Sequence, residues 1–160
     1  DYFTYAGKIT AEIKREEQYT LIKSEVIVME FQRINRVFAS HLVAFTAFRI
    51  LVKKHPKLDL YSLLRLPVED IEIDYAEFRK AFDVLRDRVI ELFNADKIDM
   101  ATHLTGDIDA VIDLGIENVG MYHSRRPLVK NKMGNIVTQD INNLYYYHNR
   151  MDGYELEKYV

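Results

Sequence analysis

The sequence predicts a mainly α-helical fold, a bundle-like helical domain with one small β-hairpin near the C-terminus. Three observations predict it: an apolar stripe at helical spacing between residues 34 and 52, aspartates placed to cap later helices, and two short runs around a glycine-containing turn. A chain of 160 residues is long enough to bury one cohesive core. We therefore expect a single helical domain over residues 1–160.

The strongest periodic signal runs from Ile34 to Val52. Its stripe consists of Ile34, Val37, Phe38, His41, Leu42, Phe45, Phe48 and Val52. A membrane span needs about 20 predominantly apolar residues, whereas this shorter run also contains His41 and Arg49. It predicts a central helix, buried on most sides, that ends where Pro56 disfavours helical geometry. Upstream, residues 9–30 predict one or two further helices.

Capping residues mark the helices that follow Pro56. We expect helices from the cap Asp59 to Leu66, from the cap Asp74 to residue 95, from a cap at Thr105 or Asp107 to the glycines at 115–120, and from the cap Asp140 to about Arg150. Residues 127–130 and 135–138 flank the turn 131–134 and predict the hairpin. This hairpin is the only clear strand signal.

Composition excludes several kinds of site. The chain has no cysteine, which removes disulfides, cysteine–zinc sites and thiol nucleophiles. It begins with Asp1 and has no signal-peptide pattern, so we expect an intracellular fragment from the C-terminal part of a longer protein. Residues 121–151 contain five Lys or Arg against one Asp, although the net charge of the chain is −3. The C-terminal fifth is therefore locally basic.

Known catalytic and metal-binding motifs are absent from the sequence. The five histidines form no i,i+3 or i,i+4 pair, and neither a phosphate-binding glycine loop nor a Gly-x-Ser-x-Gly elbow occurs. The acidic residues at 107, 109, 113 and 117 lack the glycine and ligand spacing of a calcium loop. We expect no catalytic residue, no metal site and no cofactor.

Two segments combine aromatic, histidine and arginine side chains, residues 122–127 and residues 145–150. Because they flank the expected hairpin, the fold can bring them together and offer guanidinium groups beside aromatic rings to an anion or a lipid surface. The candidate binding residues are His123, Arg125, Arg126, Tyr146, His148, Asn149 and Arg150. A purely structural interpretation stays open, in which tyrosine rings pack in the core and arginines cap helices.

Helices followed by a hairpin also fit a winged-helix module or another helical binding module for nucleic acid or a protein partner. The helix expected at 75–95 would be its recognition helix, but its charges are balanced and the whole chain is acidic. Nucleic-acid binding depends on attraction to phosphates, so nucleic acid is the disfavoured partner.

The segment 144–150, Leu-Tyr-Tyr-Tyr-His-Asn-Arg, resembles the aromatic Tyr-Tyr-x-Asn feature near the C-terminus of bacterial membrane-associated glycerol-3-phosphate acyltransferases. The helix at 34–48, the leucine-rich helix at 58–66 and the long helix at 75–95 are similar in order to the helical region behind the catalytic domain of that family. Tyr146 and Asn149 match the feature. The resemblance covers most of the chain and implies a parent enzyme that transfers a fatty acyl chain to glycerol 3-phosphate.

The catalytic signature of that family, His-x-x-x-x-Asp, does not occur in this chain. His55 and Asp59, like His103 and Asp107, are separated by three residues rather than four. The resemblance therefore implies a non-catalytic C-terminal accessory domain for phospholipid biosynthesis. Its expected partners are the upstream catalytic domain of the same chain and an anionic membrane surface. Its expected location is cytoplasmic, peripheral on the inner face of the cell membrane, with Arg125 and Arg126 contributing to lipid binding.

Overall fold

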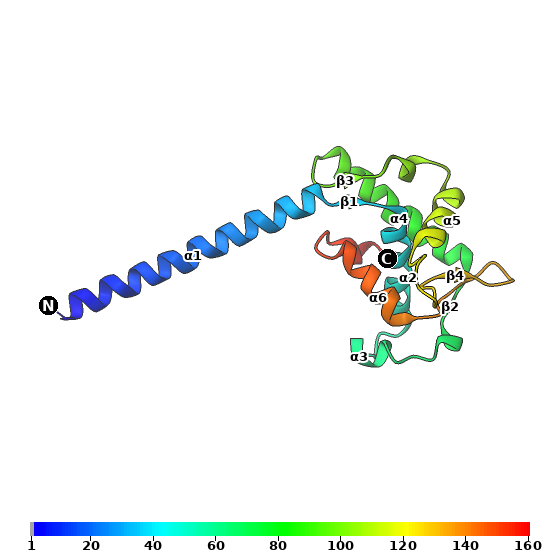
Figure 1. Cartoon of the computed structure of the whole chain (residues 1–160), viewed down its shortest axis with the longest axis horizontal. Coiled ribbons are helices and arrows are strands. Elements are labelled where there is room, and N and C mark those ends of the chain that lie inside the picture. Colours follow the sequence, from blue (N-terminus) through cyan, green and yellow to red (C-terminus); the bar gives the residue numbers. More distant parts are fainter. Residues whose placement is uncertain (1) are drawn as a thin grey trace. The chain divides into compact units, whose positions relative to one another are not determined.

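The computed structural model describes residues 2–160, and the side chains of residues 13–160 except residue 70. It is mainly helical with a small strand content, which confirms the predicted fold class (Figure 1). The chain divides into two compact units, residues 1–35 and residues 36–160. Each unit is described by itself below.

Unit 1 is one long helix, α1, which spans Tyr2–Ile34. Where the sequence predicts one or two helices over residues 9–30, the structure has a single continuous one. A lone helix cannot bury its own side chains, and the apolar residues of its described part are exposed. They include Ile13, Leu21, Ile22, Val26, Ile27, Val28, Met29, Phe31 and Ile34.

The central helix of unit 2, α2, spans Ala39–Lys54 and begins later than predicted. The expectation that it starts at Ile34 is wrong, because Arg36–Val37 forms a short strand, β1, that pairs in parallel with β3, Asp99–Met100. Arg36 Nε donates to Asp99 Oδ2 at 2.7 Å and reinforces this pairing. At the start of α2, the backbone N–H of Ala39 donates to His103 Nε2 at 3.3 Å.

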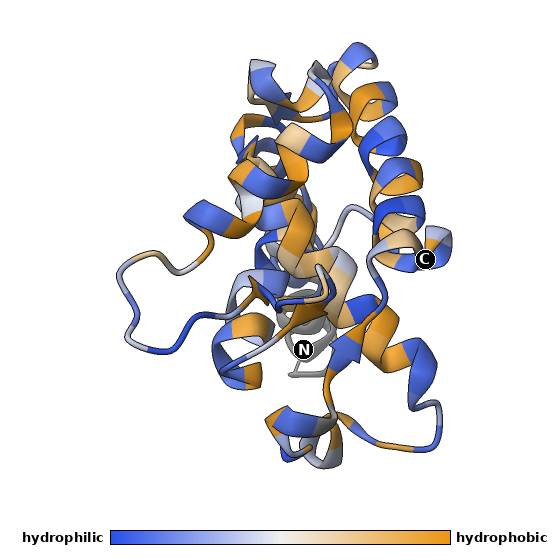
Figure 2. Ribbon diagram, turned by 90° about the vertical axis from the view of Figure 1, so that its right-hand side faces the viewer, coloured by the Kyte–Doolittle hydropathy of each residue, from blue (hydrophilic) through white to orange (hydrophobic). Residues whose placement is uncertain are grey.

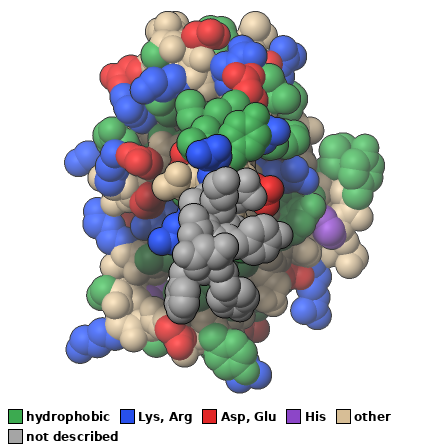
Figure 3. Space-filling view, turned by 90° about the vertical axis from the view of Figure 1, so that its left-hand side faces the viewer, with side chains coloured by type: hydrophobic (Ala, Val, Ile, Leu, Met, Phe, Trp, Pro, Cys, Tyr) green, Lys and Arg blue, Asp and Glu red, His purple; other side chains and the backbone are tan. Residues whose placement is uncertain are grey.

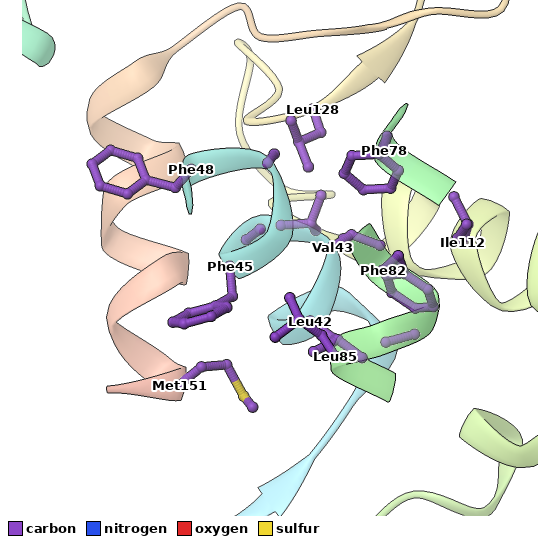
Figure 4. Close-up of a cluster of buried hydrophobic side chains, with 14 of the residues drawn as sticks. Leu42, Val43, Phe45, Phe48, Phe78, Phe82, Leu85, Ile112, Leu128 and Met151 are labelled. Atoms are coloured by element: carbon purple, nitrogen blue, oxygen red, sulfur yellow. The ribbon is translucent and has the colours of Figure 1, made fainter. Parts of the chain in front are cut away.

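Helix α2 is buried on most sides, as predicted from its apolar stripe. It packs against α4 (Tyr75–Asn94), α5 (Ile108–Asn118) and α6 (Ile141–His148). Figure 4 shows Leu42, Val43 and Phe45 of α2 among core residues that include members of α4 and α5. The approach of α5 to α2 is so close that a Cβ atom on Gly115 would lie 2.8 Å from the carbonyl oxygen of Ala39. Glycine is therefore required at this crossing.

Every predicted aspartate cap is confirmed in the structure. Asp59 accepts a hydrogen bond from the backbone N–H of Ser62 at the start of α3 (Leu60–Leu63). The equivalent bonds at α4, α5 and α6 join Asp74 to Glu77, Asp107 to Ala110, and Asp140 to Asn143. Short 3-10 helices complete the unit: η1 Val68–Asp70, η2 Thr102–Thr105, η3 Asn149–Met151 and η4 Leu156–Tyr159.

The predicted hairpin is present as β4 (Val129–Lys130) and β5 (Ile136–Val137). A third strand that the sequence does not reveal, β2 (Glu72–Ile73), pairs antiparallel with β5, so the strand order is β2-β5-β4. The helix directly before the hairpin is α5 and not the helix at 75–95, which corrects the expected position of a recognition helix.

Hydrophilic residues interrupt the hydrophobic ones along the helices of unit 2 (Figure 2). Across the described part of the chain, no helix combines the length and the apolar character that crossing a bilayer requires.

Candidate aromatic and basic surface

The fold brings the two predicted aromatic and basic segments together at one point. The Nε2 atom of His123 lies 3.3 Å from the hydroxyl oxygen of Tyr147, and their ring centroids are 6.0 Å apart with an edge-on orientation. His123 belongs to the loop after α5, and Tyr147 belongs to α6. This contact supports the expectation that the fold joins segments on either side of the hairpin.

The loop that carries His123 is held at both ends. Gly120 has φ = +60°, a conformation that favours glycine, and a Cβ atom there would lie 2.4 Å from Cδ of Pro127. At the other end, the backbone of Arg126 exchanges hydrogen bonds with Gln139, whose side-chain oxygen accepts at 2.9 Å and whose N–H donates at 3.1 Å. The residues between these anchors are exposed.

Six residues form the group that we call the aromatic–basic surface: the exposed Tyr122, His123, Arg125, Tyr146 and Arg150, and the half-buried Tyr147. The ring of Tyr146 meets that of Tyr147 edge-on at 5.3 Å. The guanidinium carbon of Arg150 lies 5.7 Å from the centroid of the Tyr146 ring, and its Nη2 donates to the Tyr146 hydroxyl at 3.4 Å. Tyr122 is 93% exposed. The surface thus offers aromatic faces and two arginines to a partner.

Arg126 has a structural role, whereas its neighbour Arg125 is exposed. Its Nη2 donates to the carbonyl oxygens of Ile116 at 2.8 Å and Glu117 at 2.5 Å, and its Nε donates to Val119 O at 3.3 Å. These carbonyls lie at the C-terminus of α5, where a helix leaves carbonyl groups unpaired and attracts positive charge. The guanidinium therefore caps the helix.

His148 belongs to the core. Only 6% of the residue is exposed, and its ring stacks on Phe45 at 4.9 Å and contacts Phe48 at 4.6 Å. Its Nδ1 lies 3.1 Å from Oδ1 of the exposed Asn149, whereas no described residue forms a hydrogen bond with its buried Nε2. Burial lowers the pKa of His148, since it disfavours the charged imidazole. For His148, the purely structural interpretation that the sequence left open therefore applies: its ring packs in the core and is not available to a partner.

His41 lies on helix α2. From the sequence it can be recognised only as a polar residue within an apolar stripe. Burial, together with the positive charge of Arg150, lowers the pKa of His41 to about 4. The effect of Arg150 links α2 to the segment after α6. No local pattern could reveal it, because the two residues lie far apart in the sequence.

A groove of about 470 Å³ lies between α5 and β4. Ile116, Leu128 and Val129 provide its apolar lining, and an ion pair between Lys130 and Asp113 joins the two elements. Lys130 Nζ also lies 4.2 Å from the centroid of the Tyr75 ring. With Arg126 at the C-terminus of α5, these contacts fix the hairpin against the helix.

Among the residues that the structure describes, no group of three or more His, Asp or Glu side chains could hold a metal ion. His123 contacts a tyrosine hydroxyl, and none of the described carboxylates contacts His123 to orient it. What the described surface can do chemically is donate hydrogen bonds to anions and stack against planar or apolar groups.

No protein-family model matches the chain, and comparison with curated proteins and with solved structures finds no match either.

Proposed function

We propose that the chain is a non-catalytic C-terminal accessory domain of a phospholipid-biosynthesis acyltransferase, whose parent protein transfers a fatty acyl chain to glycerol 3-phosphate. The observation that carries the proposal is the segment Leu144–Arg150, which follows the hairpin and matches the aromatic feature of that family at Tyr146 and Asn149. In the structure this segment builds a helix whose His148 packs in the core. Its half-buried Tyr147 contacts His123 of the loop after α5.

In this proposal the domain contacts the upstream catalytic domain of the same polypeptide and is cytoplasmic, peripheral to the inner face of the cell membrane. The aromatic–basic surface is suited to such a contact, because exposed tyrosines and arginines are enriched at protein interfaces. An exposed tyrosine provides a large contact area and loses little conformational entropy.

The reading frame that encodes the chain provides the first test. It should contain a His-x-x-x-x-Asp signature upstream of Asp1, and changing that histidine to alanine should abolish acyl transfer to glycerol 3-phosphate. The variant Tyr122→Ser with Tyr146→Ser should retain its fold but weaken association of the separately produced domains. A reading frame without the signature would contradict the proposal.

A second candidate function, a winged-helix protein-binding module, is favoured by the topology. The order α2, β2, α4, α5 and the hairpin β4–β5, with β2 paired to β5, resembles that of winged-helix modules once the short elements between them are set aside. Helix α5 takes the place of the recognition helix, but it has no Lys or Arg and exposes Asp113 and Glu117. Since phosphates repel such a face, the analogy favours a protein partner. Binding of duplex DNA at low salt, measured by fluorescence anisotropy, would contradict this assignment.

A further inference from the structure

Helix α3 is a small apolar projection at one end of unit 2 (Figure 1). Within the helix, Leu63 alone is buried, and it anchors the turn to the core. Leu58, Leu60 and Tyr61 are 39%, 45% and 64% exposed. The Asp59 cap fixes the backbone of this turn. The projection therefore holds three large apolar side chains in solvent on a defined backbone.

Two basic side chains adjoin this projection in the sequence. Lys57 precedes it and Arg65 follows it, and both are exposed. The guanidinium carbon of Arg65 lies 4.4 Å from the centroid of the Tyr61 ring. Within the described part of the chain, neither Lys57 nor Arg65 forms an ion pair with a carboxylate. Among the described residues, two cations thus flank the apolar group in the sequence, and the exposed carboxylate of Asp59 between them caps the helix. We call these five residues, Lys57, Leu58, Leu60, Tyr61 and Arg65, the α3 tip.

We propose that the α3 tip docks on an anionic membrane surface, with Leu58, Leu60 and Tyr61 entering the boundary between head groups and acyl chains and with Lys57 and Arg65 contacting lipid phosphates. Tyrosine rings favour this boundary because one end is apolar and the other is hydrated. Long basic side chains can bury their stems and keep the charged ends at head-group level. The inference rests on the proposed function only for its biological setting.

The shape of the tip favours a bilayer over a second copy of the chain. A stable dimer interface buries about 800 Å² on each partner, and a convex turn with three exposed apolar side chains provides far less. A bilayer accepts a projection residue by residue, and its anionic lipids complement the two cations. Hydrophobic side chains beside Lys and Arg recur on the face drawn in Figure 3, so exposure alone does not single out the tip. The tip is distinguished by an anchored turn that combines three exposed apolar residues with two cations that form no ion pair with a described carboxylate.

The absence of tryptophan from the chain permits a direct test. Tyr61→Trp places a single fluorescent reporter on the α3 tip, and Met133→Trp places a matched reporter on the hairpin turn, where Met133 is 82% exposed. Each variant is mixed with phosphatidylcholine vesicles that contain or lack phosphatidylglycerol. We expect a blue shift of Trp emission for Tyr61→Trp with the anionic vesicles and no shift for Met133→Trp. An unshifted Tyr61→Trp spectrum, or a shift of Met133→Trp alone, would overturn the proposal.

Vesicle co-sedimentation gives the energetic counterpart. Lys57→Glu with Arg65→Glu should weaken binding to anionic vesicles about tenfold or more, because both attractive charges become repulsive. Lys132→Glu, an exposed residue of the hairpin turn, should change vesicle binding less than twofold. If the double variant and the control lost vesicle binding equally, the tip would have no specific role. A stable dimer of the chain that Leu60→Asp dissociates would also contradict the proposal. Far-ultraviolet circular dichroism checks that each variant is folded. Since vesicle binding requires no acyl transfer, the docking proposal and the proposed function can fail independently.

Discussion

Two adjacent arginines offer a sharp test of the structural assignments at the end of α5. Arg125 is exposed, whereas the guanidinium of Arg126 donates to the carbonyl oxygens of Ile116, Glu117 and Val119. Arg126→Ala removes all of these hydrogen bonds and the positive charge at the helix C-terminus. Arg125→Ala removes the same side chain one residue earlier and serves as the matched control.

The size of the effect follows from the contacts. A hydrogen bond from a charged donor contributes about 1.5–3 kcal/mol, and the bonds of one guanidinium are not additive. Water can replace part of the loss because Arg126 is half-buried. We therefore expect Arg126→Ala to lower the free energy of unfolding by about 2–3 kcal/mol. Arg125→Ala should change it by less than about 0.5 kcal/mol, as is usual for exposed residues.

Urea unfolding of the full chain, followed by near-ultraviolet circular dichroism of the aromatic residues, measures both changes. With a slope of about 2 kcal/mol per M of urea, the midpoint for Arg126→Ala should fall by about 1 M or slightly more. Arg126→Lys keeps the charge but loses the planar fork, so its midpoint should lie between those of Arg126→Ala and the unmodified chain. Equal midpoints for the two alanine variants would refute the capping role.

Three further predictions concern the core. His148→Ala should lower the free energy of unfolding by about 2–4 kcal/mol, because it leaves a cavity beside Phe45. His148→Phe fills most of that cavity and should lower the free energy of unfolding much less. The midpoints of urea unfolding measure both changes. Burial lowers the pKa of His41 to about 4, so the unfolded chain binds more protons between about pH 4 and 6.5. Stability should therefore fall as the pH drops through this range, less steeply in His41→Gln; equal slopes would contradict the assignment. Gly115→Ala should lower the free energy of unfolding by about 1–3 kcal/mol, because the added Cβ atom pushes α5 away from α2. Gly134→Ala is the comparison variant: its Cβ atom meets open space, so only the backbone conformation at φ = +87° opposes the substitution.

The elements that the sequence predicts correctly are those specified by neighbouring residues. Each aspartate cap bonds to an N–H three residues later, as Asp74 does to Glu77, so the signal is local. The hairpin is equally local, since Gly134 lies in its turn with φ = +87°. In contrast, β1 and β3 have two residues each and join Arg36 to Asp99. Strands this short show no periodicity, and their partners lie far along the chain, so the late start of α2 could not be predicted.

The same contrast between local and long-range signals applies to the candidate site. The sequence identified the two segments that meet at His123 and Tyr147, because their composition and their place beside the hairpin are visible in it. It could not separate Arg125 from Arg126, since only the tertiary fold places one guanidinium over the end of α5. Nor could it place His148 in the core, where the rings of Phe45 and Phe48 enclose it. Residue type predicts the chemistry that is available, and packing decides which residues remain free to use it.

Acyl transfer by the natural polypeptide that contains this chain is the most direct test of the proposed function. The natural polypeptide, purified with its membrane lipids, should convert glycerol 3-phosphate and a fatty acyl thioester into lysophosphatidate, followed with radiolabelled glycerol 3-phosphate. The 160 residues by themselves should show no turnover above the background without protein. Turnover by the isolated chain, or no turnover by the natural polypeptide, would contradict an accessory domain of an acyltransferase.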